Sequence, residues 1–245
     1  MVRAIDYDKR REEVLAAVVD SYIHNASAVS SEALAPNFNY SSATIRSIMS
    51  ELEEMALLTH IHTSSGRIPT DKGYRFYVDN LLMEIGLLQT EKDEILKEYK
   101  KSRKELDVLL EKTSDLLSSF THCTGIVSFV EANDKIFYSG MSVMLEQPEF
   151  HDLKRIRILM NLLEEKQRLL GVINRDLEER IRIYIGRELP FAALDSCTLI
   201  TSNYKVKDKP QGCIAVLGPT RMEYARIIPA IEYISEMLSS ILSDF

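Results

Sequence analysis

The spacing of apolar residues changes once along this chain, and that change limits the fold more than any other feature. Through most of the first 120 residues, apolar side chains recur at intervals of three and four, the pattern of helices with one buried face. From Gly125 onward, short apolar runs rich in strand-forming residues are separated by turns. The sequence therefore predicts an α+β protein with a helical first part and a mostly antiparallel sheet in the second.

The first 82 residues predict four helices and one hairpin. The helices are expected over residues 7–24, 30–35, 41–57 and 70–82. Pro36 is expected to end the second helix, Ser41 or Ser42 to cap the third, and Thr70 to cap the fourth. A strand pattern at 58–63, a turn and a short return at 67–69 make the hairpin. Helix, helix, helix, hairpin, helix is the order of a winged helix-turn-helix, so residues 1–82 are predicted to form such a domain.

Residues 83–120 carry a seven-residue apolar repeat. This pattern predicts a helical linker of one long helix or two in series, and it fits both pairing with a second copy and packing on a sheet. Residues 121–245 are expected to form the third domain. Its strands are predicted at 126–130, 136–138, 181–185, 197–204 and 212–217, with an intervening helix at 149–174 and a final apolar helix after Gly218.

The formal net charge of −7, from 30 basic and 37 acidic residues, argues at first against a nucleic-acid partner. The local distribution differs, because the stretch from His60 to Tyr77 holds Arg67, Lys72 and Arg75 against a single acid, Asp71. This basic strip coincides with the predicted hairpin and the helix after it. Phosphate binding there is expected, with weak non-specific affinity because the domain as a whole is net negative.

Side chains suited to DNA also occupy the first turns of the third predicted helix. Ser42, Thr44 and Ser47 are short and polar, and Arg46 has the reach to bond a guanine with two hydrogen bonds. A small helical domain can equally serve as a protein docking module, and an α+β domain can sense a small ligand. These two alternatives stay open at the level of composition and spacing.

No catalytic or metal-binding pattern is present in the sequence. The five histidines form no His-Glu-x-x-His arrangement, the three cysteines form no Cys-x-x-Cys pair, and no nucleophile stands beside a base. We therefore expect neither an enzyme nor a metal or cofactor protein. Met1 to Arg10 is polar and no apolar run reaches membrane-spanning length, so we expect a cytoplasmic protein without a membrane partner.

Two stretches resemble the family of the heat-inducible transcription repressor HrcA. The first reads YSSATIR from Tyr40 to Arg46, and the second reads HTSSGRIPTDKGYRFYVD from His62 to Asp79. In the second half, QPEF at 147–150, IGRE at 185–188 and GPTRMEY at 218–224 resemble the GAF-like C-terminal domain of that family.

The resemblance implies a dimeric repressor of chaperone genes that binds an inverted-repeat operator in double-stranded DNA. It also implies the chaperonin GroEL as a partner that keeps the repressor active. Carried onto this sequence, the third helix would enter the major groove through Ser42, Thr44, Arg46 and Ser47. The wing and the following turn would hold phosphates through His62, Thr63, Ser64, Arg67, Thr70, Lys72 and Arg75, with Gly66 allowing a tight turn.

The chain departs from the family pattern at two places. Ser47-Ile48 stands where the family usually has Asn-Glu, which removes a side chain suited to reading adenine. The family also carries a longer middle between the segments matching Ser128 and Ile136, including an inserted dimerisation domain. We therefore expect the linker helix and the final helix to make the dimer contact, through Leu106, Leu109, Leu116, Ile227, Ile231, Ile234 and Leu238.

Overall fold

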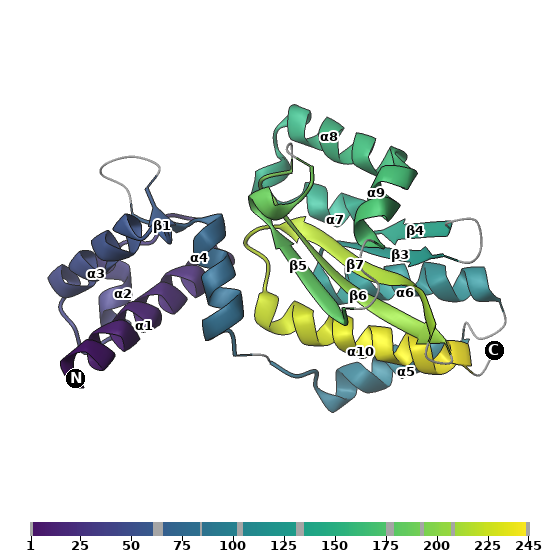
Figure 1. The fold of residues 1–245 in the computed structure, drawn as a ribbon, viewed down its shortest axis with the longest axis horizontal. Helices are drawn as coiled ribbons and strands as arrows, with labels where there is room; N and C mark the ends of the chain where they lie inside the picture. Colours follow the sequence, from purple (N-terminus) through teal and green to yellow (C-terminus); the bar gives the residue numbers. More distant parts are fainter. Residues whose placement is uncertain are drawn as a thin grey trace. The chain divides into compact units, whose positions relative to one another are not determined.

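The computed structural model describes residues 2–60, 66–83, 85–101, 105–130, 135–174, 179–191, 194–206 and 209–243. The chain divides into two compact units, an N-terminal unit of residues 1–83 and a C-terminal unit of residues 84–245. Figure 1 shows the elements of both, and each unit is described by itself. Among the helices in the described ranges, none is long and apolar enough to cross a membrane.

The N-terminal unit has the predicted order of helices and hairpin. Its elements are α1 (Val2–Asn25), α2 (Ser31–Leu34), η1 (Ala35–Asn37), α3 (Ser42–Glu54), β1 (Leu58–Thr59), β2 (Ile68–Pro69), α4 (Asp71–Phe76) and η2 (Tyr77–Leu81), a π-helical turn that continues α4. One detail differs from the prediction: the chain does not leave the helix at Pro36 but tightens into the 3-10 turn η1. Proline is tolerated there because the first turn of a helix does not need its N–H.

The core of the N-terminal unit is built by one face each of α1 and α3. Val14, Leu15, Val18 and Val19 of α1 are fully buried, as the three- and four-residue spacing predicts. The end of α4 is fastened to α1 by the hydroxyl of Tyr77, which donates to the Asp20 carboxylate at 2.7 Å. Burial, together with Asp20, raises the pKa of Tyr77 well above its ordinary value.

The C-terminal unit is organised around one five-stranded sheet. Its strands are β3 (Thr124–Phe129), β4 (Lys135–Ser139), β5 (Ile181–Ile185), β6 (Cys197–Val206) and β7 (Lys209–Pro219), in the spatial order β4-β3-β7-β6-β5. Every neighbouring pair is antiparallel. The prediction of an α+β fold with a mostly antiparallel sheet is confirmed.

Helices cover both faces of this sheet (Figure 1). On one face, α7 (Met141–Leu145), α8 (Leu153–Glu164) and α9 (Lys166–Ile173) share an apolar core with alternate strand residues such as Leu199 and Leu217. On the other face, α6 (Leu106–Thr121) lies against β3 and β4, and α10 (Tyr224–Ser243) lies against β6 and beside α6. Two short 3-10 turns, η3 (Pro148–Phe150) and η4 (Gly186–Glu188), complete the unit. The single helix predicted over 149–174 is thus η3, α8 and α9 in series.

The segment predicted as a separate linker belongs to the C-terminal unit. It forms α5 (Gln89–Lys101) and α6, so the alternative of two helices in series holds. The two helices contact each other where the hydroxyls of Tyr99 and Thr113 lie 3.0 Å apart in the core. At the start of α5, Glu91 pairs with Arg226 of α10 at 2.7 Å. The seven-residue repeat is therefore used to pack the helices inside the unit.

The predicted dimer residues need correction for the same reason. Six of the seven are less than 7% exposed within their own chain, namely Leu109, Leu116, Ile227, Ile231, Ile234 and Leu238, and Leu106 is half-buried. Side chains that fill the space between helices and sheet present no surface to a second copy. If this chain pairs with a copy of itself in this conformation, other side chains make the contact.

The three cysteines pack as small apolar side chains. Cys123, Cys197 and Cys213 are all buried and none is in a disulfide. Burial raises the pKa of each thiol to about 12, so all three are protonated at neutral pH.

The contact between α5 and α6 can be tested with a pair of substitutions. Thr113 donates its own proton to the Leu109 carbonyl at 2.8 Å, so the Tyr99 hydroxyl donates to Thr113. Thr113→Val leaves a fully buried Tyr99 hydroxyl without an acceptor, and we expect it to cost about 1–3 kcal/mol of unfolding free energy. Tyr99→Phe removes the hydroxyl and strands no donor, so its cost should be smaller, about 0.5–1.5 kcal/mol. Urea unfolding followed by circular dichroism measures both, and equal costs would contradict the buried donor.

Candidate nucleic-acid interface

The helix-turn-helix is fixed at its corners by two serine caps. The Ser30 side chain accepts a hydrogen bond from the Ala33 N–H at the start of α2, and the Ser41 side chain accepts one from the Thr44 N–H at the start of α3, both at 3.1 Å. A serine at this position satisfies a helix N–H that otherwise has no partner. The cap predicted at Ser41 or Ser42 is thus Ser41, and it sets where the first turn of α3 begins.

The burial pattern of α3 determines which side chains point outward. Ile45, Ile48, Met49 and Leu52 form its buried face. Thr44, Arg46 and Ser47 are exposed, and Ser42 is half-buried. The four residues predicted to enter the major groove therefore start from the exposed side of one helix. The Thr44 hydroxyl also lies 2.9 Å from the Ser41 hydroxyl, which holds its side chain against the cap.

Arg46 is held by an acidic residue on the neighbouring helix. Its Nη2 donates to Oε1 of Glu32 in α2 at 3.1 Å. Both side chains remain largely in solvent, at 66% and 72% exposure, and an ion pair this exposed is weak. Glu32 was not among the predicted site residues, because 14 positions separate it from Arg46 and the pairing depends on how α2 and α3 pack.

A second acid, Glu53 near the end of α3, joins this helix to the hairpin formed by β1 and β2, the predicted wing. Its carboxylate lies 2.7 Å from Nε of Arg67 and also bonds Nδ1 of His60. Arg67 in turn pairs through its backbone with Val29, with N–H to carbonyl distances of 2.8 and 2.9 Å. Glu53 thus connects α3 to both sides of the hairpin. It is the second residue that the sequence prediction missed.

Gly66 is needed for a different reason from the one predicted. Its φ is not in the left-handed region, where the positive-φ glycines of the described residues are Gly140 and Gly186. A Cβ at Gly66 would instead lie 2.4 Å from the carbonyl oxygen of Val29. The close approach of two backbones, rather than a tight turn, requires glycine here.

Thr70 caps α4 as predicted, and this engagement competes with the phosphate contact that was also expected of it. Its hydroxyl accepts a hydrogen bond from the Gly73 N–H at 3.0 Å and donates to the Ala56 carbonyl at 2.7 Å. Its backbone N–H donates to the Leu57 carbonyl at 3.1 Å. Both donors of Thr70 are engaged within the protein, so a phosphate oxygen would have to displace one of these bonds.

The two remaining cations of the basic strip also have partners. The Lys72 ammonium donates to the Met55 carbonyl at the end of α3 at 3.0 Å, and Arg75 pairs with Asp79 one turn later at 3.2 Å. An ammonium has three donors, so Lys72 keeps capacity for a phosphate oxygen. The other predicted wing contacts, His62, Thr63 and Ser64, lie outside the described residues.

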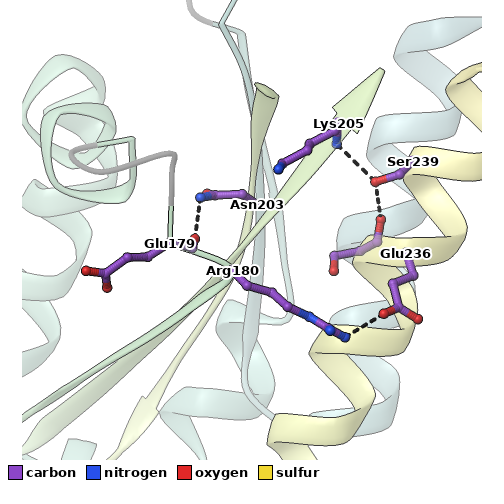
Figure 2. A pocket seen from close by; sticks show the side chains of 7 residues that line it. Glu179, Arg180, Asn203, Lys205, Glu236 and Ser239 are labelled. Atoms are coloured by element: carbon purple, nitrogen blue, oxygen red, sulfur yellow. Dashed lines mark hydrogen bonds and ion pairs between the residues drawn. The ribbon is translucent and has the colours of Figure 1, made fainter. Parts of the chain in front are cut away.

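The C-terminal unit offers one described pocket that bears on ligand sensing. It has a volume of about 340 Å³ and lies at the start of β5, between β6 and α10 (Figure 2). Several of its polar groups already bond within the protein: Arg180 pairs with Glu236, Asn203 donates to the Glu179 carbonyl, and the Ser239 hydroxyl accepts from the Lys205 backbone N–H. A polar ligand that used these groups would have to displace the bonds that they make.

Metal binding finds no support in the described ranges. No group of three or more His, Cys, Asp or Glu side chains comes together there in a way that could hold a metal ion.

Two family models match this chain. One, described as the winged helix-turn-helix transcription repressor HrcA, DNA-binding, matches residues 7–80, and the other, described as the HrcA protein C terminal domain, matches residues 128–228. The first covers nearly all of the N-terminal unit, and the second covers the central part of the C-terminal unit. A solved crystal structure of a hypothetical protein has the same fold, with a TM-score of 0.75 at 20% identity over 96% of this chain and 98% of that one.

Curated proteins similar to this chain are heat-inducible transcription repressors HrcA. That of Geobacter sulfurreducens is 29% identical, over 97% of this chain and 98% of the relative, and that of Brevibacillus brevis is 26% identical, over 96% and 98%. The first alignment runs over 337 positions, which is 92 more than the 245 residues of this chain. The relatives therefore carry stretches that have no counterpart here.

The Glu53 contact predicts how the wing responds to substitution. Glu53→Gln removes the charge that Arg67 and His60 share, and we expect about 1–2 kcal/mol less protection of the backbone pair between Val29 and Arg67. That corresponds to roughly tenfold faster amide exchange in the peptides that contain Val29 or Arg67, measured by hydrogen exchange and mass spectrometry. Glu54→Gln makes the same change on the exposed last residue of α3 and should leave exchange unchanged. Equal exchange in both variants would show that Glu53 does not hold the wing.

Proposed function

The chain belongs to the HrcA family of heat-inducible transcription repressors and carries its DNA-binding winged helix; we propose that it represses chaperone genes by binding an inverted-repeat operator as a dimer. The observation that carries the proposal is the exposed face of α3, where Thr44, Arg46 and Ser47 stand together beside a serine cap. Short polar side chains and one arginine at the start of a helix suit contact with base edges in a major groove.

In this proposal each part of the N-terminal unit has one task. Arg46 donates two hydrogen bonds to a guanine edge, while Ser42 and Ser47 bond bases or phosphates beside it. Lys72 and Arg75 contact phosphates from α4, and Arg67 does so from the wing that Glu53 holds in place. Ser47 replaces a residue suited to adenine, so the operator of this chain should differ from that of its relatives at the base that this position faces.

Dimerisation follows from the symmetry of the operator. One winged helix covers one half-site, and an inverted repeat is bound most tightly by two copies related by a two-fold axis. Six of the seven apolar residues first assigned to the dimer contact are buried in the C-terminal unit, so we do not assign the contact to them. We also propose the chaperonin GroEL as a partner, and only the family resemblance supports this.

Two other functions receive less support. A ligand sensor needs polar groups ready to bond a ligand, whereas Arg180, Asn203 and Ser239 of the described pocket are already engaged within the protein. We do not propose an enzyme, since a transcription repressor needs no catalysis. As a repressor, the chain would act where the chromosome lies, in the cytoplasm.

Two substitutions test the base and phosphate contacts. We expect Arg46→Ala to weaken binding to the inverted repeat by about 1–3 kcal/mol and to relax its sequence preference. Lys72→Ala should weaken binding to all sequences alike and reduce the salt slope by about one. Fluorescence anisotropy at several salt concentrations measures both, on a repeat that the protein selects from random duplexes and on a scrambled duplex. Lys9→Ala, which removes an exposed lysine of α1, is the control for a lost charge.

Binding by all variants equal to that of the wild-type chain would remove both residues from the interface. If Arg46→Ala weakens the selected and the scrambled duplex by the same factor, Arg46 contacts phosphates and does not read a base.

The oligomeric state is a separate test. We expect sedimentation velocity to show a dimer at protein concentrations that saturate the inverted repeat, and two chains per duplex in the complex. A monomer that binds the full repeat tightly with one chain per duplex would contradict the dimeric repressor.

A further inference from the structure

The ion pair between Arg46 and Glu32 brings an acid to the one arginine of the recognition face. We propose that Glu32 determines sequence specificity, by holding Arg46 in position for a base edge and away from phosphates in non-specific DNA. The inference rests on the proposed DNA-binding function of α3. It assigns a role to a residue on α2 that the family pattern did not single out.

Glu32 is placed by the fold at a defined point beside α3. It lies in the first turn of α2, a short helix whose start is fixed by the Ser30 cap and whose Ser31 and Leu34 are buried. Arg46 lies on α3 between the buried residues Ile45 and Ile48. The positions of both backbones are therefore set by packing, and the 3.1 Å contact depends only on the two side chains.

The chemistry of the guanidinium group allows one pairing without preventing the other. A guanidinium has five N–H donors, and Glu32 accepts from Nη2 alone. The second proton of Nη2 and the protons of Nη1 remain for a guanine edge, which takes two parallel hydrogen bonds. A carboxylate on one side of the group thus orients its plane while the other side contacts a base.

A phosphate competes with Glu32 for Arg46 in a way that a guanine does not. The phosphate and the Glu32 carboxylate are both anions. If the Arg46 guanidinium turns toward the DNA backbone, either its bond to Glu32 breaks or Glu32 moves closer to the phosphates, where like charges repel. The neutral base edge imposes no such repulsion. Glu32 therefore weakens contacts that are independent of sequence more than it weakens the base contact.

The other cations of the unit show why this pair responds to DNA. In the pairs Arg67–Glu53 and Arg75–Asp79 the arginine side chains are 21% and 28% exposed, whereas Arg46 is 66% exposed. Because Arg46–Glu32 is the most exposed of the three ion pairs, it should contribute the least free energy. A nucleic acid that approaches Arg46 can therefore break this pair at a small cost in free energy. Glu32 can influence specificity only if Arg46 is able to exchange its contact with Glu32 for a contact with DNA.

The test compares Glu32→Gln with the wild-type chain on the selected inverted repeat and on a scrambled duplex. We expect the affinity for the scrambled duplex to rise about twofold to fivefold, and its salt slope to increase by about one, because Arg46 gains a phosphate. Affinity for the inverted repeat should stay the same or fall, so the ratio of the two affinities decreases. Loss of folding stability lowers both affinities and cannot produce this result.

Two further variants complete the experiment. Glu54→Gln removes the same charge from the exposed end of α3, and it should leave the affinity ratio unchanged. In the double variant Glu32→Gln, Arg46→Ala, the effect of Glu32→Gln on the ratio should disappear, since it acts through Arg46.

The outcomes separate this inference from the function on which it rests. A drop in operator affinity with Arg46→Ala, combined with an unchanged ratio in Glu32→Gln, overturns the role of Glu32 and leaves the repressor proposal intact. If Arg46→Ala changes neither affinity, the recognition face itself is misassigned and both fall. A ratio reduced equally by Glu54→Gln would show a general charge effect and also overturn the inference.

Discussion

The burial of one face of α3 is the constraint on which the rest of the N-terminal unit depends. Ile45, Ile48, Met49 and Leu52 all pack into the core at 3% exposure or less, and this fixes the rotation of the helix about its axis. A helix turns about 100° per residue, so fixing these four residues also fixes Thr44, Arg46 and Ser47 on the solvent side. The face of α3 that we propose for DNA contact is thus a consequence of the core.

In the N-terminal unit, the arginines expected to contact DNA are paired with acidic residues. A net charge of −7 disfavours binding to DNA phosphates, and the basic strip contains only three Lys and Arg residues. In the structure, Arg46, Arg67 and Arg75 each face a carboxylate of the same unit. Such a surface attracts phosphates weakly and depends more on shape and base contacts. In the proposed function, these acids are therefore part of the recognition surface rather than an obstacle to it.

Sequence reasoning found the elements that local chemistry determines. The caps at Ser41 and Thr70, the buried face of α3 and the five strands follow from spacing and residue type, and the structure confirms them. The partners of the charged residues could not be predicted, because Glu32 and Arg46 meet only when α2 and α3 pack. The seven-residue repeat misled the assignment of the dimer contact, since one apolar face fits a second copy and the sheet equally well.

Hydroxyl-radical footprinting of the DNA upstream of the gene for this chain tests the central claim most directly, namely that an exposed α3 and its wing read an inverted repeat. We expect two protected patches related by two-fold symmetry, with half-site centres separated by about one helical turn, roughly 10 base pairs, or a multiple of it. Each patch should flank a major groove that faces the protein. Cleavage identical to that of free DNA at saturating protein, or a single unsymmetrical patch, would contradict the claim.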